Sequence, residues 1–217
     1  MNETGSKTLS LGTDPDAALE AAREAVASGQ CVVFPTDTVY GIGCAAFDSK
    51  AVSGLLEAKK RGSDMPPPVL IAESSMLRAL AAQVPEAAKK LVVRFWPGAL
   101  TIIVRAQRSL PLDLGDTQGT VAVRVPDHDQ ARALLRRTGP IAVSSANVSG
   151  EPAATSVREA HRMLGDAVAV YLDGGRASGA APSTIVDFTG PEDGRVLRQG
   201  AIDLEALREV VPELQAG

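Results

Sequence analysis

The stretch Phe-Pro-Thr-Asp-Thr-Val-Tyr-Gly-Ile-Gly at residues 34–43 is the most informative part of the sequence. The apolar run at residues 31–34 has the length and β-branching of a buried strand. Pro35 has no amide hydrogen to donate, so we expect strand pairing to end there. Short hydroxyl and carboxyl side chains follow, and Gly41 and Gly43 permit tight turns. Because open α/β sheets bind ligands at strand ends, this segment predicts a binding loop; alternatively, its polar side chains only cap the next element.

The composition is that of an ordinary globular protein. The chain has 217 residues, of which 45% are apolar and 22% are charged, enough for one large domain or two small ones. No apolar run approaches the length of about 18 residues that a membrane span needs, so we expect none. The polar residues 1–13 lack the apolar core of a signal peptide, which predicts a cytoplasmic protein.

Neither the cysteines nor the histidines suggest a metal site. Cys31 and Cys44 lie in or near the predicted buried strand, where an intracellular protein keeps them reduced. His128 and His161 have no Cys or His neighbour at the spacing of metal ligands. With a net charge of −4 and a pI near 5.3, the chain lacks the basic excess of proteins that hold nucleic acids by bulk charge.

Strands and helices are mixed from residue 14 to residue 212, between polar tails expected at residues 1–13 and 213–217. Periodicity and capping signals predict helices at residues 17–28, 49–60, 85–95, 127–137, 156–164 and 204–211. Strands are predicted at residues 31–34, 69–72, 100–104, 121–125, 141–143, 168–172, 183–187 and 195–197. Because strands adjoin one another late in the chain, we expect an α/β domain with a mixed sheet.

Four cationic side chains lie near the ends or centres of these elements. Lys59 and Arg61 end the second predicted helix, where they either complement the helix dipole or bind an anion. In the strand at residues 121–125 the valines alternate onto one face and Arg124 onto the other, toward solvent or toward a ligand. Arg198 follows the last predicted strand. Guanidinium groups suit the bidentate binding of carboxylates and phosphates.

Small polar residues gather in the loop at residues 144–150, which follows a predicted strand. Such a loop lets backbone N–H groups approach a phosphate or carboxylate closely. Ser183 and Thr184 place further hydroxyl groups at a strand start. The sequence has no Ser-His-Asp order, no Cys-His pair and no glycine-rich nucleotide fingerprint. This pattern favours the positioning and charge stabilisation of anions over covalent catalysis.

Seven short segments follow one another along residues 17–205, at residues 35–41, 59–61, 96–101, 120–126, 140–150, 182–187 and 197–200. Together they resemble the YrdC-like family of threonylcarbamoyl-AMP synthases. The resemblance implies the YrdC-like fold, which is one α/β domain with a twisted, mixed parallel and antiparallel sheet flanked by helices. We expect that catalytic domain at residues 14–212, in the short bacterial form without the extra C-terminal domain of longer members.

The resemblance further implies a nucleotidyltransferase, an L-threonylcarbamoyladenylate synthase. Its substrates are L-threonine, bicarbonate or CO2, and ATP, and its products are L-threonylcarbamoyl-AMP and pyrophosphate. A threonylcarbamoyl transferase complex then carries the group to adenosine in tRNA, so the reaction is the first step of threonylcarbamoyladenosine modification. Mg²⁺ is expected on the phosphates of ATP, and no organic cofactor is implied. A weak direct contact with tRNA is a further expectation.

The site residues implied by the resemblance fall into two groups. Lys59 and Arg61 are implied as catalytic residues. The positions that match threonine-binding residues of the family are Thr36, Arg124 and Ser183. The positions that match nucleotide-binding residues are Lys59, Arg61, Thr120, Ser145, Asn147 and Arg198, and no protein ligand of a metal ion is implied.

The chain departs from the family pattern next to the threonine-binding positions. Met65, Pro66 and Pro67 stand where many relatives have Lys-Pro-Leu or Asn-Pro-Leu, and Leu70 stands where several have a histidine. We therefore expect threonine to be bound by Thr36 and Arg124 rather than by this segment.

Two other functions are compatible with the fold class. One is a non-catalytic module that binds double-stranded RNA, which the net charge of −4 disfavours. The other is a hydrolase or a maturation factor for another protein, because related domains occur in carbamoyl-transferring maturation proteins. Release of pyrophosphate from ATP, threonine and bicarbonate without RNA discriminates between catalysis and RNA binding.

Overall fold

The computed structural model describes residues 5–179 and 181–217. The stretch at residues 34–43 forms an antiparallel hairpin of β2 (Val32–Pro35) and β3 (Tyr40–Ala45). As expected, strand pairing ends at Pro35, which is the last residue of β2 and is in register with Tyr40. The expectation of tight turns at the glycines was wrong, because Gly41 and Gly43 lie inside β3, a strand that was not predicted from the sequence.

The two glycines let β3 approach its neighbours closely. A Cβ atom on Gly43 would lie 2.6 Å from Cγ2 of Ile141 and 3.1 Å from Cε1 of Phe34. A Cβ atom on Gly41 would lie 2.8 Å from Cγ1 of Val143. Glycine is therefore required here for close packing between strands rather than for a turn.

The described residues form a sheet of ten strands in the order β1-β8-β2-β3-β7-β4-β6-β5-β9-β10. Four neighbouring pairs are parallel (β1/β8, β2/β8, β4/β6 and β5/β9) and the others are antiparallel, which confirms the predicted mixed sheet. The remaining strands are β1 (Lys7–Ser10), β4 (Val69–Leu70), β5 (Leu100–Arg105), β6 (Thr120–Arg124), β7 (Ile141–Ser145), β8 (Val170–Asp173), β9 (Thr184–Asp187) and β10 (Arg195–Arg198).

Both predicted tails contribute to the fold. Residues 7–10 lie in the expected N-terminal tail but form β1, which pairs in parallel with β8 at the edge of the sheet. In the expected C-terminal tail, Leu214 is buried and Gln215 makes an isolated bridge with Arg195. The ordered domain is therefore longer at each end than the range 14–212.

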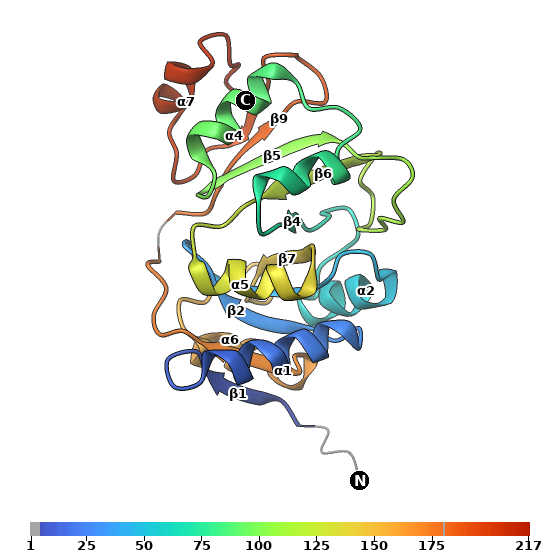
Figure 1. Cartoon of the computed structure of the whole chain (residues 1–217), viewed down its shortest axis with the longest axis vertical. Coiled ribbons are helices and arrows are strands. Elements are labelled where there is room, and N and C mark those ends of the chain that lie inside the picture. Colours follow the sequence, from blue (N-terminus) through green and yellow to red (C-terminus); the bar gives the residue numbers. More distant parts are fainter. Residues whose placement is uncertain (1–4, 180) are drawn as a thin grey trace.

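Helices cover the two faces of the sheet unequally. They are α1 (Pro15–Ala27), α2 (Ser49–Ala58), α3 (Leu77–Leu80), α4 (Glu86–Phe95), α5 (Asp129–Thr138), α6 (Val157–Leu164) and α7 (Leu204–Val210), with 3₁₀ turns η1 (Ser74–Met76) and η2 (Gly165–Ala167). The larger core joins α2, α3, α4, α6 and α7 to one face, and a smaller core joins only α1 and α5 to the other. Figure 1 shows α1 and α5 beside β1 and β2, far from β5 and β9. The second face is thus uncovered over β5, β6 and β9.

Within the described residues, no helix is long and apolar enough to cross a membrane.

Substituting Gly43 by alanine should destabilise the fold by about 1–3 kcal/mol, because the new methyl group would overlap the side chains of Ile141 and Phe34. The matched control is Gly54→Ala in α2, where a Cβ atom meets nothing within 4 Å. That change should stabilise the protein by about 0.5–1 kcal/mol, because alanine favours a helix. Urea unfolding measures both. An unchanged midpoint for Gly43→Ala would contradict close packing at β3.

Candidate functional site

The uncovered part of the sheet holds a cavity of about 870 Å³. Its floor is formed by β4, β5, β6, β7 and β9, and its rim by the turn at residues 36–39 and the proline-rich loop at residues 65–68. With the exception of Lys59, every site residue expected from the sequence lines the cavity: Thr36, Arg61, Thr120, Arg124, Ser145, Asn147, Ser183 and Arg198. These residues come from segments more than 160 positions apart, and the sheet brings them together.

The cavity carries an excess of positive charge. Arg61, Arg124 and Arg198 line it, whereas Glu151 is the only carboxylate among the described lining residues. Burial lowers the pKa of all three guanidinium groups. The pKa of Arg198 is lowered further by the charges of Arg124 and Arg61. Since burial disfavours all three cations and Arg198 is also disfavoured by its two cationic neighbours, the cavity favours an anionic ligand.

Arg61 is the cation with the most unused hydrogen-bonding capacity. Its Nη1 donates to Oγ of Ser144 at 3.1 Å. Its Nε is buried and has no hydrogen-bond partner among the described residues. A buried donor without a partner is costly, so a ligand oxygen at this position would offset that cost.

Lys59 lies behind the cavity wall rather than in it. Its side chain is buried, and Nζ donates to the backbone oxygens of Ser145 at 2.5 Å and Asn147 at 2.7 Å. The amide of Ser149 in turn donates to the backbone oxygen of Lys59 at 2.9 Å. Burial, and then the charge of Arg61, lowers the pKa of Lys59 to about 8. The structure therefore places Lys59 where it holds the loop at residues 144–150, and does not bring it to the nucleotide side as expected.

That loop presents Ser145 and Asn147 to the cavity. The side-chain Nδ2 of Asn147 donates to the backbone oxygens of Val148 at 2.9 Å and Glu151 at 2.6 Å, which fixes the conformation of the loop. The small polar loop predicted at residues 144–150 is thus found, but it is shorter than expected, because Ser144 and Ser145 still belong to β7.

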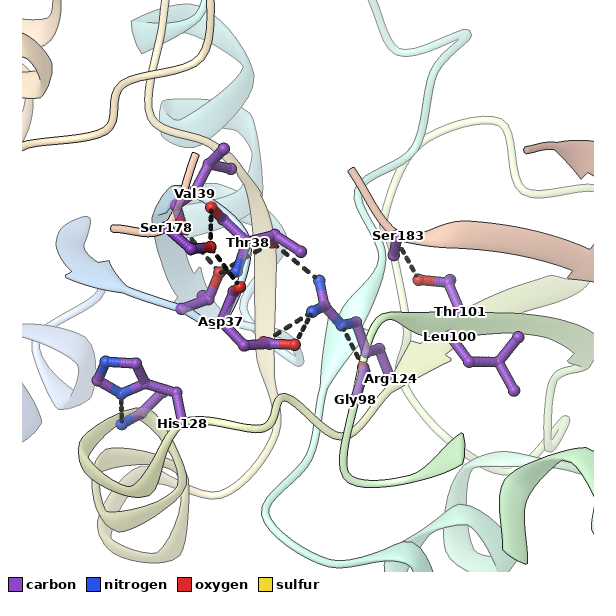
Figure 2. Close-up of polar contacts among 12 residues, drawn as sticks. Asp37, Thr38, Val39, Gly98, Leu100, Thr101, Arg124, His128, Ser178 and Ser183 are labelled. Carbon is purple, nitrogen blue, oxygen red and sulfur yellow. Dashed lines mark hydrogen bonds and ion pairs between the residues drawn. The ribbon is translucent and has the colours of Figure 1, made fainter. Parts of the chain in front are cut away.

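Arg124 lies on the cavity side of β6, opposite its neighbouring valines, as alternation predicts. Figure 2 shows its guanidinium directed at the turn between β2 and β3. Nη2 is 2.7 Å from both carboxylate oxygens of Asp37, Nε donates to the backbone oxygen of Gly98 at 2.9 Å, and Nη1 donates to Oγ1 of Thr38 at 3.3 Å. A free two-pronged fork for a substrate carboxylate, as expected from the sequence, is therefore absent in this arrangement of the described residues.

The expected hydroxyl groups are largely engaged within the protein. Oγ1 of Thr36 donates to the backbone oxygen of Val39 at 2.6 Å. Oγ of Ser183 and Oγ1 of Thr101 share a hydrogen bond of 2.8 Å, seen in Figure 2. Oγ1 of Thr120 donates to the backbone oxygen of Thr117 at 2.7 Å. They fix the cavity's shape.

Sequence reasoning missed several lining residues. Thr38 and Thr101 belong to segments already singled out, so their position in those motifs was a usable signal. Leu114 and Thr117 come from an irregular loop that carries no such signal. Leu70 lines the cavity beside Arg124, its partner in the parallel β4/β6 ladder, so an apolar side chain occupies that position.

No cluster of three or more His, Cys, Asp or Glu side chains that could hold a metal ion occurs within residues 5–179 and 181–217.

Comparison with known proteins identifies close relatives. The family model Sua5_yciO_yrdC, described as telomere recombination, matches residues 24–200. A protein of Mycobacterium tuberculosis named "Putative threonylcarbamoyl-AMP synthase" is 51% identical over 187 residues, which cover 86% of each chain.

Solved structures agree in fold. A variant of Pyrococcus abyssi Sua5 superposes with a TM-score of 0.92 at 34% identity, over 98% of this chain and 62% of that one. The crystal structure of P. abyssi Sua5 complexed with L-threonine superposes with a TM-score of 0.86 at 36% identity, over 92% and 58% of the two chains. The fold predicted from the sequence, a single α/β domain with a mixed sheet flanked by helices, is confirmed.

Proposed function

The chain belongs to the Sua5–YciO–YrdC family, and on that premise we propose that it synthesises L-threonylcarbamoyl-AMP from L-threonine, bicarbonate or CO2, and ATP. The observation that carries the proposal is the cavity with three guanidinium groups and a single lining carboxylate among the described residues. Two of the substrates are anions, and the third carries a carboxylate. The enzyme is then a nucleotidyltransferase, like the relatives named threonylcarbamoyl-AMP synthase.

We assign the two substrates to different sides of the cavity. The triphosphate of ATP lies against Arg61, Arg198 and the loop at residues 144–150, where charge and small side chains permit close approach. L-Threonine lies near Arg124, Thr36 and Ser183. The P. abyssi relative complexed with L-threonine supports threonine as a substrate. A cavity of about 870 Å³ is within the range of about 300–1,000 Å³ of small-molecule sites.

In the proposed reaction the threonine amine bonds to the carbon of CO2 and loses a proton, which gives a carbamate. If bicarbonate is the donor, its C–OH bond breaks as the N–C bond forms, and the hydroxyl group leaves as water with the amine proton. A carbamate oxygen then attacks the α-phosphorus of ATP, and the bond to pyrophosphate breaks. Negative charge builds on the phosphoryl oxygens as pyrophosphate leaves. Arg61 and Arg198 are fixed before the reaction and stabilise this charge, which is the main way such sites lower the barrier.

The donor set fits a Mg²⁺ ion that arrives on ATP. Mg²⁺ prefers oxygen ligands and is often bound through substrate phosphates and one or two carboxylates. Glu151 is the carboxylate among the described lining residues, and Ser144 and Ser145, which carry hydroxyl groups, also line the cavity. When bound, the ion would neutralise part of the phosphate charge.

We further propose that the product passes to a threonylcarbamoyl transferase complex, which modifies adenosine in tRNA. We expect this work to take place in the cytoplasm, where ATP and tRNA are found. Any tRNA contact of this chain itself is expected to be weak, because its net charge is −4.

The test uses the purified protein with ATP, L-threonine and bicarbonate, without RNA. Pyrophosphate release that depends on all three, together with threonylcarbamoyl-AMP detected by mass spectrometry, supports the proposal. Pyrophosphate release that does not depend on threonine, or no release in any mixture, contradicts it. Binding of double-stranded RNA without such release would favour the alternative of an RNA-binding module.

Ser145→Leu should weaken ATP binding by 100-fold or more, because the larger side chain fills the space in which the loop approaches the phosphates. Ser145→Ala should lose only about 1 kcal/mol, the contribution of one neutral hydrogen bond. Ser149→Leu is the control, since this exposed residue of the same loop is outside the cavity lining. Calorimetric titration with a non-hydrolysable ATP analogue measures all three. Equal losses for Leu and Ala at Ser145 would contradict close approach.

A further inference from the structure

Asp37 has a partner that its position in the sequence did not reveal. It lies in the turn between β2 and β3, and its two carboxylate oxygens are each 2.7 Å from Nη2 of Arg124. The pair is shielded from solvent, with side-chain exposures of 8% for Arg124 and 15% for Asp37. Figure 2 shows the carboxylate and the guanidinium facing each other between the two halves of the sheet. An ion pair so shielded is far more strongly coupled than a surface pair.

The ion pair and two neighbouring contacts occupy most of the hydrogen-bond donors of Arg124. A guanidinium has five N–H groups. Both N–H groups of Nη2 donate to the carboxylate of Asp37, and the Nε–H group donates to the backbone oxygen of Gly98. One of the two N–H groups of Nη1 donates to Oγ1 of Thr38. Among the described residues this leaves one Nη1 hydrogen on a side chain that lines the cavity. Arg124 is thus a fixed, single-donor group.

Asp37 contacts Arg124 but does not itself line the cavity among the described residues. It is absent from the described lining of the cavity, whereas its neighbours Thr36 and Thr38 are part of it. Its backbone oxygen accepts a hydrogen bond from Oγ of Ser178 at 3.0 Å, which ties the turn to the segment after β8. Asp37 is therefore placed to act on Arg124 rather than on a substrate.

We propose that Asp37, with Thr38, is a positioning residue for amino-acid recognition: it holds the Arg124 guanidinium so that the remaining Nη1 hydrogen meets the carboxylate of threonine. The proposal rests on the function proposed above.

The test is Asp37→Asn, which keeps the shape of the side chain and removes its charge. L-Threonine binding, measured by calorimetry, should weaken about tenfold, since a charged hydrogen bond is misplaced. The KM for threonine should rise equally, while the KM for ATP changes by less than twofold. A variant that is partly unfolded would instead show changed KM values for both threonine and ATP.

Two further variants keep the experiment decisive. Glu73→Gln removes the carboxylate of an exposed ion-pair cluster with Arg132 and Arg136, and should leave threonine binding unchanged. Because removing one partner of a buried pair destabilises a protein, Asp37→Asn could fail to fold. Thr38→Val then decides, since it removes the Nη1 contact, together with the hydrogen bond between the hydroxyl groups of Thr38 and Thr36, and leaves the ion pair of Asp37 in place. It should weaken threonine binding about threefold.

The outcomes are distinct. Unchanged threonine affinity in a folded Asp37→Asn, or in Thr38→Val when the first variant does not fold, overturns the positioning role. Tighter threonine binding also overturns it, because Asp37 would then be a competitor for Arg124. If the wild-type protein itself neither binds L-threonine nor releases pyrophosphate, the proposed function fails, and this inference fails with it.

Discussion

Arg61→Ala is expected to lower the rate of pyrophosphate release by about 100- to 1,000-fold while the fold stays intact. Arg61 lines the cavity, donates to Ser144 from Nη1, and has a buried Nε without a partner among the described residues. Its charge is thus preorganised for phosphate oxygens and contributes little to the fold. The loss should fall mainly on kcat, because charge on the leaving pyrophosphate grows toward the transition state.

The control for Arg61 is its neighbour Lys60, which is exposed and is outside the cavity lining. Lys60 has a left-handed backbone with a φ of 52°, so Lys60→Asn removes the charge with a residue that tolerates this conformation. It should release pyrophosphate at the wild-type rate. If Arg61→Ala retains near-normal activity, Arg61 is only a cation after the end of α2, and the phosphate assignment is wrong.

Arg124→Lys is expected to raise the KM for threonine about 10- to 100-fold and the KM for ATP much less. A lysine keeps the charge, but its single ammonium cannot reach Asp37, Gly98 and the cavity at the same time. The substrate carboxylate would then meet a cation that is no longer held in place.

Kinetics with each substrate varied in turn measure the effect of Arg124→Lys. Arg136→Lys is the matched control, because Arg136 pairs with Glu73 on the surface, far from the cavity lining. If only the KM for ATP rises, Arg124 belongs with the residues that bind the triphosphate, and its assignment to threonine is wrong. No change in either constant would mean that Arg124 touches neither substrate.

Much of the fold could be predicted because local patterns report it directly. The alternation of valines in β6 placed Arg124 on the correct face, since side chains of a strand point alternately to its two sides. The small polar residues after β7 predicted a loop at the site for a similar reason. Their preference for turns and their lack of bulk are properties of the residues themselves.

The missed features depend on distant neighbours. β3 was not predicted because Gly41 and Gly43 resemble turn residues until Ile141 and Val143 are seen beside them. β1 was not predicted because a polar edge strand has no apolar pattern, and only β8 provides its partner. The same holds for Lys59, whose acceptors lie about 90 positions further along the chain. No local pattern contains such contacts.

Because β8 lies between β1 and β2, its position also determines when this edge of the sheet can form during synthesis on the ribosome. β8 begins at residue 170, yet both strands that it joins lie within the first 35 residues. Strands so far apart in sequence pair late, because a long loop must close before the contact forms. β1 and the free edge of β2 therefore stay unpaired until β8 has been synthesised, and these strand edges can pair with other chains in the meantime. Chaperone dependence during synthesis is the expected consequence, and chains truncated before residue 170 should aggregate.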